Sequence, residues 1–151
     1  MWIRFLSACL CAGASWAQSA GEEREVVAVA RKFMDVLAAR DPAAGKAILV
    51  PEARYFTIRP DGTMTAASLG EMMDRLPART ERLLERMFEP LARVSGRIAM
   101  VWAPYDFHRD GKFSHCGVDV FTLLKTSAGW RIASLAYTVE PSGCPQRPPV
   151  Q

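Results

Sequence analysis

Residues 97–140, RIAMVWAPYDFHRDGKFSHCGVDVFTLLKTSAGWRIASLAYTVE, decide the fold of this chain. Two turn signals, Asp110-Gly111 and Ser127-Ala128-Gly129, separate long runs that are rich in apolar and β-branched residues. Asp-Gly is typical of a tight two-residue hairpin, because both residues tolerate positive φ. The segment therefore predicts three consecutive antiparallel strands, over residues 97–108, 113–126 and 130–139.

The pairing across the first hairpin predicts which side chains share a face of the sheet. If the residues that flank Asp110-Gly111 pair with each other, Asp106 faces His115 and Trp102 faces Asp119. The same face then also carries Ile98, Met100, Phe121 and Leu123. A bulge would shift this register by one residue and move every side chain beyond it to the other face. Pro104 favours such a bulge, because it cannot donate a hydrogen bond to the ladder.

Both faces of the predicted sheet are largely apolar. The face opposite Asp119 would carry residues such as Val101, Tyr105, Val118 and Leu135. N-terminal helices can cover one face, and a second copy of the chain can cover the other. Because large exposed apolar patches are rare on monomers, we expect a homodimer.

A helix is predicted before the sheet. Ser19-Ala20-Gly21-Glu22 has the form of a capping box, and Val26, Ala30, Phe33 and Leu37 then recur at helical spacing. Asp41-Pro42 should end this helix, because the residue before proline avoids helical backbone angles.

The middle of the chain predicts short elements. Short helices are expected over residues 43–49 and 68–76, a strand over 54–59, and a turn at Pro60-Asp61-Gly62. Residues 80–89 have helical spacing in ERLLERMFE, but we predict a strand there because the following strands need a sheet partner.

The first 17 residues resemble a signal peptide. Arg4 is followed by an apolar run, residues 5–14, that is too short to span a bilayer, and Ser15-Trp16-Ala17 offers a cleavage site before Gln18. The alternatives are a buried N-terminal helix and a lipoprotein acylated at Cys9. The expected mature protein is periplasmic or secreted, with no membrane association after leader removal.

Removal of the leader leaves Cys116 and Cys144. An even number of cysteines in an exported protein favours one disulfide, here between the second hairpin strand and the C-terminal segment. The alternative is a buried thiol at Cys116 and an exposed one at Cys144. Residues 145–151, rich in proline, are expected to form a flexible tail.

Length and composition exclude several classes of protein. The 151 residues predict one domain, and the net charge of +3 is spread without a basic stripe, which argues against nucleic-acid binding. Two histidines and no cluster of further ligands argue against a metal site. No phosphate-binding loop or dinucleotide fingerprint is present in the sequence, so no cofactor is expected.

The order of elements and four short motifs resemble the nuclear transport factor 2-like superfamily, specifically its exported bacterial members termed SnoaL-like or lumazine-binding. The motifs are Val101-Trp102-Ala103-Pro104-Tyr105, Gly111-Lys112, Ser114-His115-Cys116-Gly117-Val118-Asp119 and Gly129-Trp130-Arg131-Ile132. The resemblance implies an α+β domain over residues 18–144. A cone-shaped, curved antiparallel or mixed sheet would wrap around the N-terminal helix and leave a pocket at its open end. It also implies dimerisation through the convex face.

The candidate site follows from the predicted face. Asp119, between two valines, should be hydrogen-bonded or raised in pKa. It is interpreted either as a base or ligand-orienting acceptor, or as a structural partner of the Trp102 indole N–H or of a backbone group. His115 with Asp106 could form an acid–base pair or a cross-strand polar pair, whereas His108 beside the turn should be solvated. The expected walls of a pocket for a small apolar or aromatic ligand are Trp102, Tyr55, Met100 and Phe121.

Two functions are compatible with these residues. The first is an exported small-molecule-binding or non-catalytic domain with an apolar pocket. The alternative is a cofactor-free lyase or isomerase, of the dehydratase or ketosteroid-isomerase type, that uses His115 with Asp106 or Asp119. Because a fold does not determine a function, whether the protein is an enzyme stays open at this point.

Overall fold

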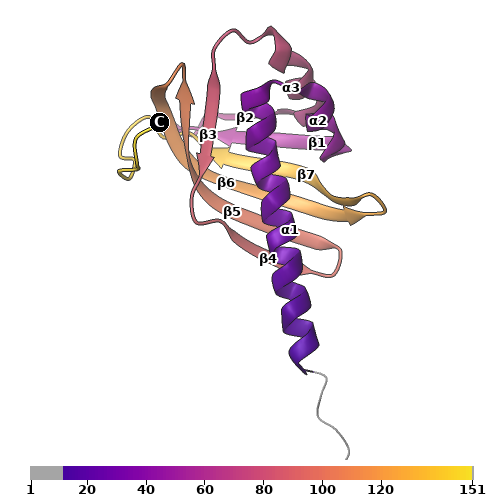
Figure 1. Ribbon diagram of the computed structural model, residues 1–151. Coiled ribbons are helices and arrows are strands. Elements are labelled where there is room, and N and C mark those ends of the chain that lie inside the picture. Colours follow the sequence, from indigo (N-terminus) through magenta and orange to yellow (C-terminus); the bar gives the residue numbers. More distant parts are fainter. Residues whose placement is uncertain (1–11, 151) are drawn as a thin grey trace, which may run out of the picture.

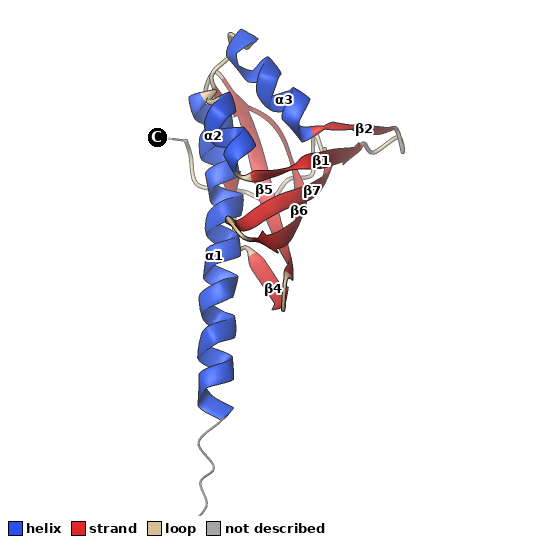
Figure 2. Cartoon of the chain, turned by 90° about the vertical axis from the view of Figure 1, so that its right-hand side faces the viewer, coloured by secondary structure: helices blue, strands red, loops and turns tan. Residues whose placement is uncertain are grey.

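A long N-terminal helix lies across one face of a curved seven-stranded sheet in the computed structural model, which describes residues 12–150 (Figure 1). The helical elements are α1 (Ala12–Ala39), α2 (Pro42–Ala47), α3 (Leu69–Arg75) and the 3₁₀ turn η1 (Leu76–Ala78). The strands are β1 (Leu49–Ile58), β2 (Met64–Ser68), β3 (Leu83–Met87), β4 (Leu91–Ser95), β5 (Ile98–Arg109), β6 (Lys112–Thr126) and β7 (Gly129–Thr138). We call the face that packs against α1 concave and the opposite face convex (Figure 2).

The sheet is mixed. Its order is β2-β1-β7-β6-β5-β3, and β4 also pairs with β5. Only β1 and β7 run parallel to each other; the remaining pairs are antiparallel. The predicted α+β class, with a curved mixed sheet around an N-terminal helix, is therefore confirmed.

Helix α1 buries the predicted apolar stripe. Val26, Ala30, Phe33 and Leu37 are all buried against the sheet. The helix already includes residues 12–18, before the predicted cap at Ser19, because this alanine-rich segment contains no proline and can continue the helix. Most of the predicted leader, residues 1–11, lies outside the described residues, so cleavage before Gln18 stays a prediction.

The predicted boundary at Asp41-Pro42 separates two helices. Arg40 has a positive φ of 55°, which ends α1. The Asp41 side chain then accepts a hydrogen bond from the backbone N–H of Ala44 at 2.9 Å and caps α2. Pro42 occupies the first turn of α2, where it loses no helical hydrogen bond.

Two edge strands were not predicted, and the ambiguous segment is a strand. β2 (MTAAS) and β4 (LARVS) are only five residues long, too short to show a clear alternation. Residues 83–87 form β3 despite their helical spacing, because pairing with β5 satisfies their backbone groups in the sheet.

Pro104 lies opposite the break between the two short edge strands. The backbone N–H of Phe88 donates to the Pro104 carbonyl at 2.8 Å, so the carbonyl of Pro104 faces the edge strands β3 and β4. The nitrogen of Pro104, which has no hydrogen to donate, faces the same edge. Met87 pairs with Tyr105 and Leu91 pairs with Trp102, and the ladder is interrupted between them. The proline therefore breaks the edge pairing, while the pairing of β5 with β6 passes Pro104 without a shift.

The register between β5 and β6 is as predicted only at the hairpin. Arg109 pairs with Lys112, but an extra residue, Ser114, shifts the pairing beyond it, and Phe107 then faces His115. A second extra residue, Ala133, shifts the pairing of β6 with β7. The predicted faces are consequently wrong beyond each bulge. Asp119 faces Ala103 rather than Trp102.

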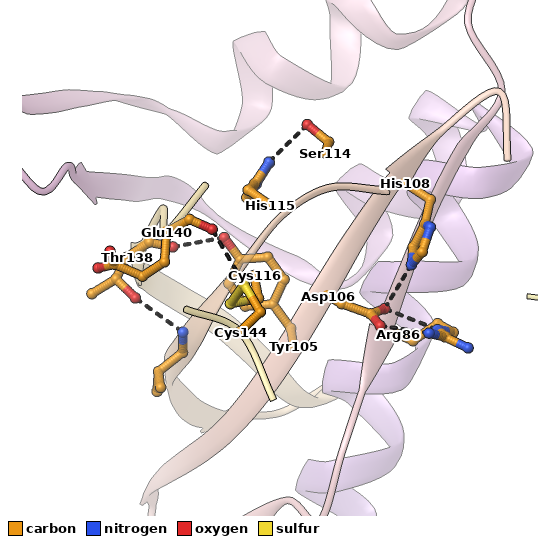
Figure 3. Close-up of a disulfide and its surroundings, with 11 residues drawn as sticks. Arg86, Tyr105, Asp106, His108, Ser114, His115, Cys116, Thr138, Glu140 and Cys144 are labelled. Carbon is orange, nitrogen blue, oxygen red and sulfur yellow. Dashed lines mark hydrogen bonds and ion pairs between the residues drawn. A yellow bond between two sulfur atoms is a disulfide. The ribbon is translucent and has the colours of Figure 1, made fainter. Parts of the chain in front are cut away.

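The C-terminal segment lies against the convex face. Cys116 and Cys144 form the predicted disulfide (Figure 3). Beyond it, the Arg86 guanidinium donates to the Pro148 carbonyl at 2.7 Å, and the Arg147 guanidinium lies 4.2 Å from the centre of the Phe88 ring. The tail is therefore attached to the sheet by a covalent bond and by two arginine contacts.

Candidate functional site

A cavity of about 270 Å³ lies between the concave face, α1 and the α3–η1 segment. Its apolar and aromatic walls are Phe33, Leu37, Tyr55, Met72, Leu76, Leu83, Tyr105, Phe107, Leu135 and Tyr137. Its polar side chains are Arg75, Arg79, Glu85, Arg109, His115 and Asp119. A concave space with mostly apolar walls and a few polar groups is typical of a small-molecule site.

Two carboxyl groups meet in this cavity. Asp119 on β6 is only 1% exposed, and neither of its side-chain oxygens has a hydrogen-bond partner within the described part of the chain. Glu85 is on β3, two strands away from β6. Its side chain is on the same face of the strand as the buried residues Leu83 and Met87. Neither carboxyl group forms a salt bridge to a basic residue among those described.

Burial and mutual proximity favour the protonated form of this carboxyl pair. Burial raises the pKa of Asp119 well above its usual range, and the nearby Glu85 carboxyl raises it further. Burial also raises the pKa of Glu85 to about 7, although its interaction with Asp119 partly opposes this shift. These shifts favour the protonated form of the pair, in which a carboxyl group can donate a hydrogen bond into the aromatic cavity.

Tyr105 and Gly117 shape the wall beside the carboxyl pair. The two residues face each other across β5 and β6, and the Tyr105 hydroxyl donates to the Thr138 carbonyl at 2.7 Å. A β-carbon at position 117 would overlap the Thr138 carbonyl and lie 2.8 Å from the Tyr105 ring. Glycine is therefore required for this close approach of the ring to β6 and β7.

His115 stands at the mouth of the cavity. Its ring stacks on Phe107, with the ring centres 5.0 Å apart, and its Nδ1 lies 3.0 Å from the Ser114 hydroxyl. Burial lowers the pKa of His115, and the charges of Arg109 and Arg59 lower it further. The imidazole is therefore neutral at physiological pH.

The structure brings together only some of the predicted site residues. Asp119, His115 and Tyr55 line the cavity. Phe121 is on the concave face but fully buried in the core against Phe33, with the ring centres 5.6 Å apart.

Trp102, Met100 and Asp106 lie on the convex face and not at the cavity, which corrects the predicted face. The cause is the bulge at Ser114, which reverses the orientation of these residues relative to Asp119. The proposed hydrogen bond from the Trp102 indole to Asp119 and the proposed pair of His115 with Asp106 are therefore both wrong.

Asp106 belongs to a separate cluster under the C-terminal tail. The Arg86 guanidinium binds its carboxylate through two hydrogen bonds, of 2.9 and 2.5 Å, and the His108 Nε2 atom lies 3.2 Å from it (Figure 3). Burial favours a higher pKa for Asp106, but the hydrogen bonds from Arg86 and the proximity of His108 outweigh it and hold the pKa below its usual value. His108 is buried rather than solvated as predicted. This ionised, paired carboxylate is a structural element and not a free base.

Glu85 is the site residue that the sequence reasoning missed. A signal was present, because a strand over residues 83–87 places Glu85 between Leu83 and Met87 on one face. A carboxylate flanked on the same face by two apolar side chains is expected to be buried and perturbed. The apolar residues of this segment also have helical spacing, so the alternation typical of a strand was not recognised from the sequence.

The carboxyl pair predicts that stability decreases as the pH rises from about 4.5 to 7. A carboxyl group with a raised pKa in the folded state holds a proton that the unfolded chain releases, so high pH favours unfolding. For Glu85 the contribution is complete below its unfolded pKa of about 4.3 and is lost as the pH rises through about 7. Urea unfolding across this range should show the decrease.

The matched variant carries both Glu85→Gln and Asp119→Asn, which replace each carboxyl by a neutral group of the same shape. Its free energy of unfolding should change less with pH and should exceed that of the wild type above neutral pH. Asp106, whose lowered pKa acts only as the pH falls below about 4, does not contribute to the slope in this range. His115, whose pKa is lowered, adds a slope of the opposite sign in both proteins, so the difference between the wild type and the variant reports the carboxyl pair. Equal slopes for the wild type and the variant would contradict a proton held by the pair.

Residues 12–150 contain no group of three or more acidic, histidine or cysteine side chains placed to hold a metal ion. No described helix combines the length and the apolar character needed to cross a membrane.

Comparisons with known proteins agree on the fold. A family model described as "Putative lumazine-binding" matches residues 21–138. No curated protein matches the sequence. A nuclear transport factor 2-like superfamily protein from Salmonella enterica is 17% identical with a TM-score of 0.65, and the match covers 83% of this chain and 95% of that one.

Two other solved structures are similar. A protein with a cystatin-like fold from Novosphingobium aromaticivorans is 15% identical with a TM-score of 0.68, covering 88% of this chain and 92% of that one. A protein from Streptomyces avermitilis described as a putative dehydratase is 14% identical with a TM-score of 0.64, covering 80% and 96%. At these identities the structures show the shared fold alone.

Proposed function

Since the chain belongs to the family described as "Putative lumazine-binding", within the nuclear transport factor 2-like superfamily, we propose that it binds a small planar heteroaromatic molecule in the concave cavity. The observation that carries the proposal is the carboxyl pair, Asp119 and Glu85, which lines an aromatic cavity without a basic partner among the described residues. Tyr55, Tyr137 and Phe107 supply flat walls for a ring system.

The carboxyl pair suits a ligand with a lactam or imide edge, such as the pteridine-dione lumazine. Such an edge presents an N–H donor next to a C=O acceptor. A protonated carboxyl group presents an O–H donor next to an acceptor oxygen and can form two parallel hydrogen bonds with that edge. Because the Asp119 carboxyl group is almost completely buried, these bonds discriminate against ligands that leave it unsatisfied.

Titration of the protein with lumazine at about pH 6, where the carboxyl pair is protonated, tests this function. Lumazine should bind in a saturable manner, and Glu85→Leu should weaken binding by about tenfold or more, because it removes a buried hydrogen-bonding group. Trp102→Phe, on the convex face, is the control and should bind like the wild type. Absence of saturable binding, or unchanged binding by folded Glu85→Leu, would count against the proposal.

A second candidate function is favoured by the pKa of Glu85. A carboxyl group with a pKa of about 7 is suited to act as a general base near neutral pH, and the neutral Asp119 could donate a hydrogen bond to an enolate oxygen. This is the lyase or isomerase alternative. His115 lies at the mouth of the cavity, whereas Asp106 cannot take part because it is on the convex face. Exchange of a bound ligand's C–H protons with solvent deuterium, lost in folded Glu85→Gln, would identify it.

Export and dimerisation stay predictions. The leader-like sequence and the disulfide support an oxidising compartment. Ile98, Trp102 and Leu124 on the convex face are each more than a third exposed, which supports a dimer through this face. The intact mass of the secreted protein tests export and leader cleavage. The mass from light scattering at micromolar concentration tests dimerisation.

A further inference from the structure

We propose that the ligand carries an anionic substituent, which Arg59, Arg109 and the Ser114–His115 pair hold in a groove at the mouth of the cavity. This inference rests on the proposed ligand-binding function and specifies the class of molecule bound there. It arises from a second hollow beside the cavity and from its charges.

The groove adjoins the cavity directly. It has a volume of about 330 Å³, and three side chains, Arg109, His115 and Tyr137, line both spaces. The groove alone is also lined by Arg59, Thr57 and Ser114. A ligand whose ring system fills the cavity can therefore extend a substituent past His115 into the groove.

The strand register explains why basic side chains gather there. Arg109 is the last residue of β5, and His115 lies near the start of β6, one turn away across the hairpin. Arg59 directly follows β1, whose residue Thr57 pairs with Tyr137. Three strands thus end or begin at the open end of the cone and place their terminal side chains around one opening.

The groove has positive charge without a matching carboxylate. None of its lining residues is acidic. Among the residues that the structure describes, neither Arg59 nor Arg109 forms a salt bridge. The acidic residue closest in sequence to Arg59 is Asp61, whose carboxylate accepts the backbone N–H of Thr63 at 2.8 Å. The charge of Arg59 helps to lower the pKa of Asp61, but the two side chains do not form a salt bridge.

The arginines on the other side of the cavity are different. Arg75 lies 3.6 Å from Glu71, and Arg79 lies 4.0 Å from Glu81, so each has an acidic neighbour. The unmatched charge is therefore concentrated on the side of His115. An anion in the groove could accept hydrogen bonds from guanidinium and hydroxyl groups, an arrangement that proteins use for carboxylates and phosphates.

Matched ligands test this inference. Lumazine and lumazine-6-carboxylate share the ring system and differ in one negative charge. The carboxylate should bind about tenfold or more tightly than lumazine at low ionic strength, and added salt should reduce the advantage. Arg59→Gln should abolish most of the advantage. Arg54→Gln is the control and should preserve the advantage, because Arg54 is an exposed arginine on β1, the strand that Arg59 follows, with its side chain on the opposite face.

His115 provides an independent readout. A bound anion beside the imidazole should raise its pKa, measured by the NMR titration of its ring protons, whereas lumazine itself should not. If lumazine binds but the carboxylate has no advantage and leaves the His115 titration unchanged, the anion groove is wrong while the proposed function stands. If neither compound binds, the proposed function fails and this inference fails with it.

Discussion

Replacement of Phe121 by alanine is expected to lower the free energy of unfolding by about 3–5 kcal/mol. Phe121 is fully buried on the concave face, between Val101 on β5 and Leu135 on β7, and its ring packs edge to face against Phe33 of α1. Truncation removes this contact and leaves a cavity where the long helix meets the sheet. Urea unfolding of the wild type and the variant gives the difference.

Phe113→Ala is the matched control for Phe121→Ala. Phe113 is also on β6 but is 48% exposed next to the hairpin, so its loss should change the stability far less. A loss below about 1.5 kcal/mol for Phe121→Ala would mean that α1 does not pack on the sheet as described.

The second large effect is expected for Asp106→Ala, at about 3–5 kcal/mol. Its carboxylate is almost completely buried and pairs with the Arg86 guanidinium and with His108. Removing the carboxylate leaves the largely buried guanidinium without its counter-ion. The measurement is again urea unfolding, at about neutral pH, where Asp106 is ionised.

The double variant Arg86→Met, Asp106→Leu separates the cost of an unpaired charge from the value of the pair. A buried ion pair replaced by apolar side chains often costs little, so the double variant should recover most of the stability lost in Asp106→Ala. Equal losses in the single and double variants would show that the pair itself, or the bond from Arg86 to Pro148 of the tail, supplies the stability.

These variants also separate two carboxylates that the expected register placed together. Asp106 and Asp119 have opposite pKa shifts because their surroundings differ: Asp106 has a guanidinium partner on the convex face, whereas Asp119 has another carboxyl group in the cavity. Asp106→Ala should affect stability without removing a cavity wall. Glu85→Leu should affect the ligand first, because Glu85 lines the cavity.

Several features of this protein could be predicted from its sequence because they are local. The Asp110-Gly111 turn, the stripe of Val26, Ala30, Phe33 and Leu37, and the end of α1 at Asp41-Pro42 depend on residues that are close in sequence. The disulfide followed from the number of cysteines, and the motifs of β5–β7 were sufficient for the superfamily. Of the candidate site, Asp119, His115 and Tyr55 were found in this way.

Only the tertiary structure decided which of these residues meet. Alternation determines the faces within a regular strand, but one extra residue at Ser114 or Ala133 reverses them, and no local pattern marked either position. The approach of Glu85 to Asp119 depends on the position of β3 in the sheet. β3 lies two strands away from β6, and it precedes β6 in the sequence by many residues. The carboxyl pair and the positive groove beside it are therefore products of strand pairing between distant segments, which alternation within a single strand cannot specify.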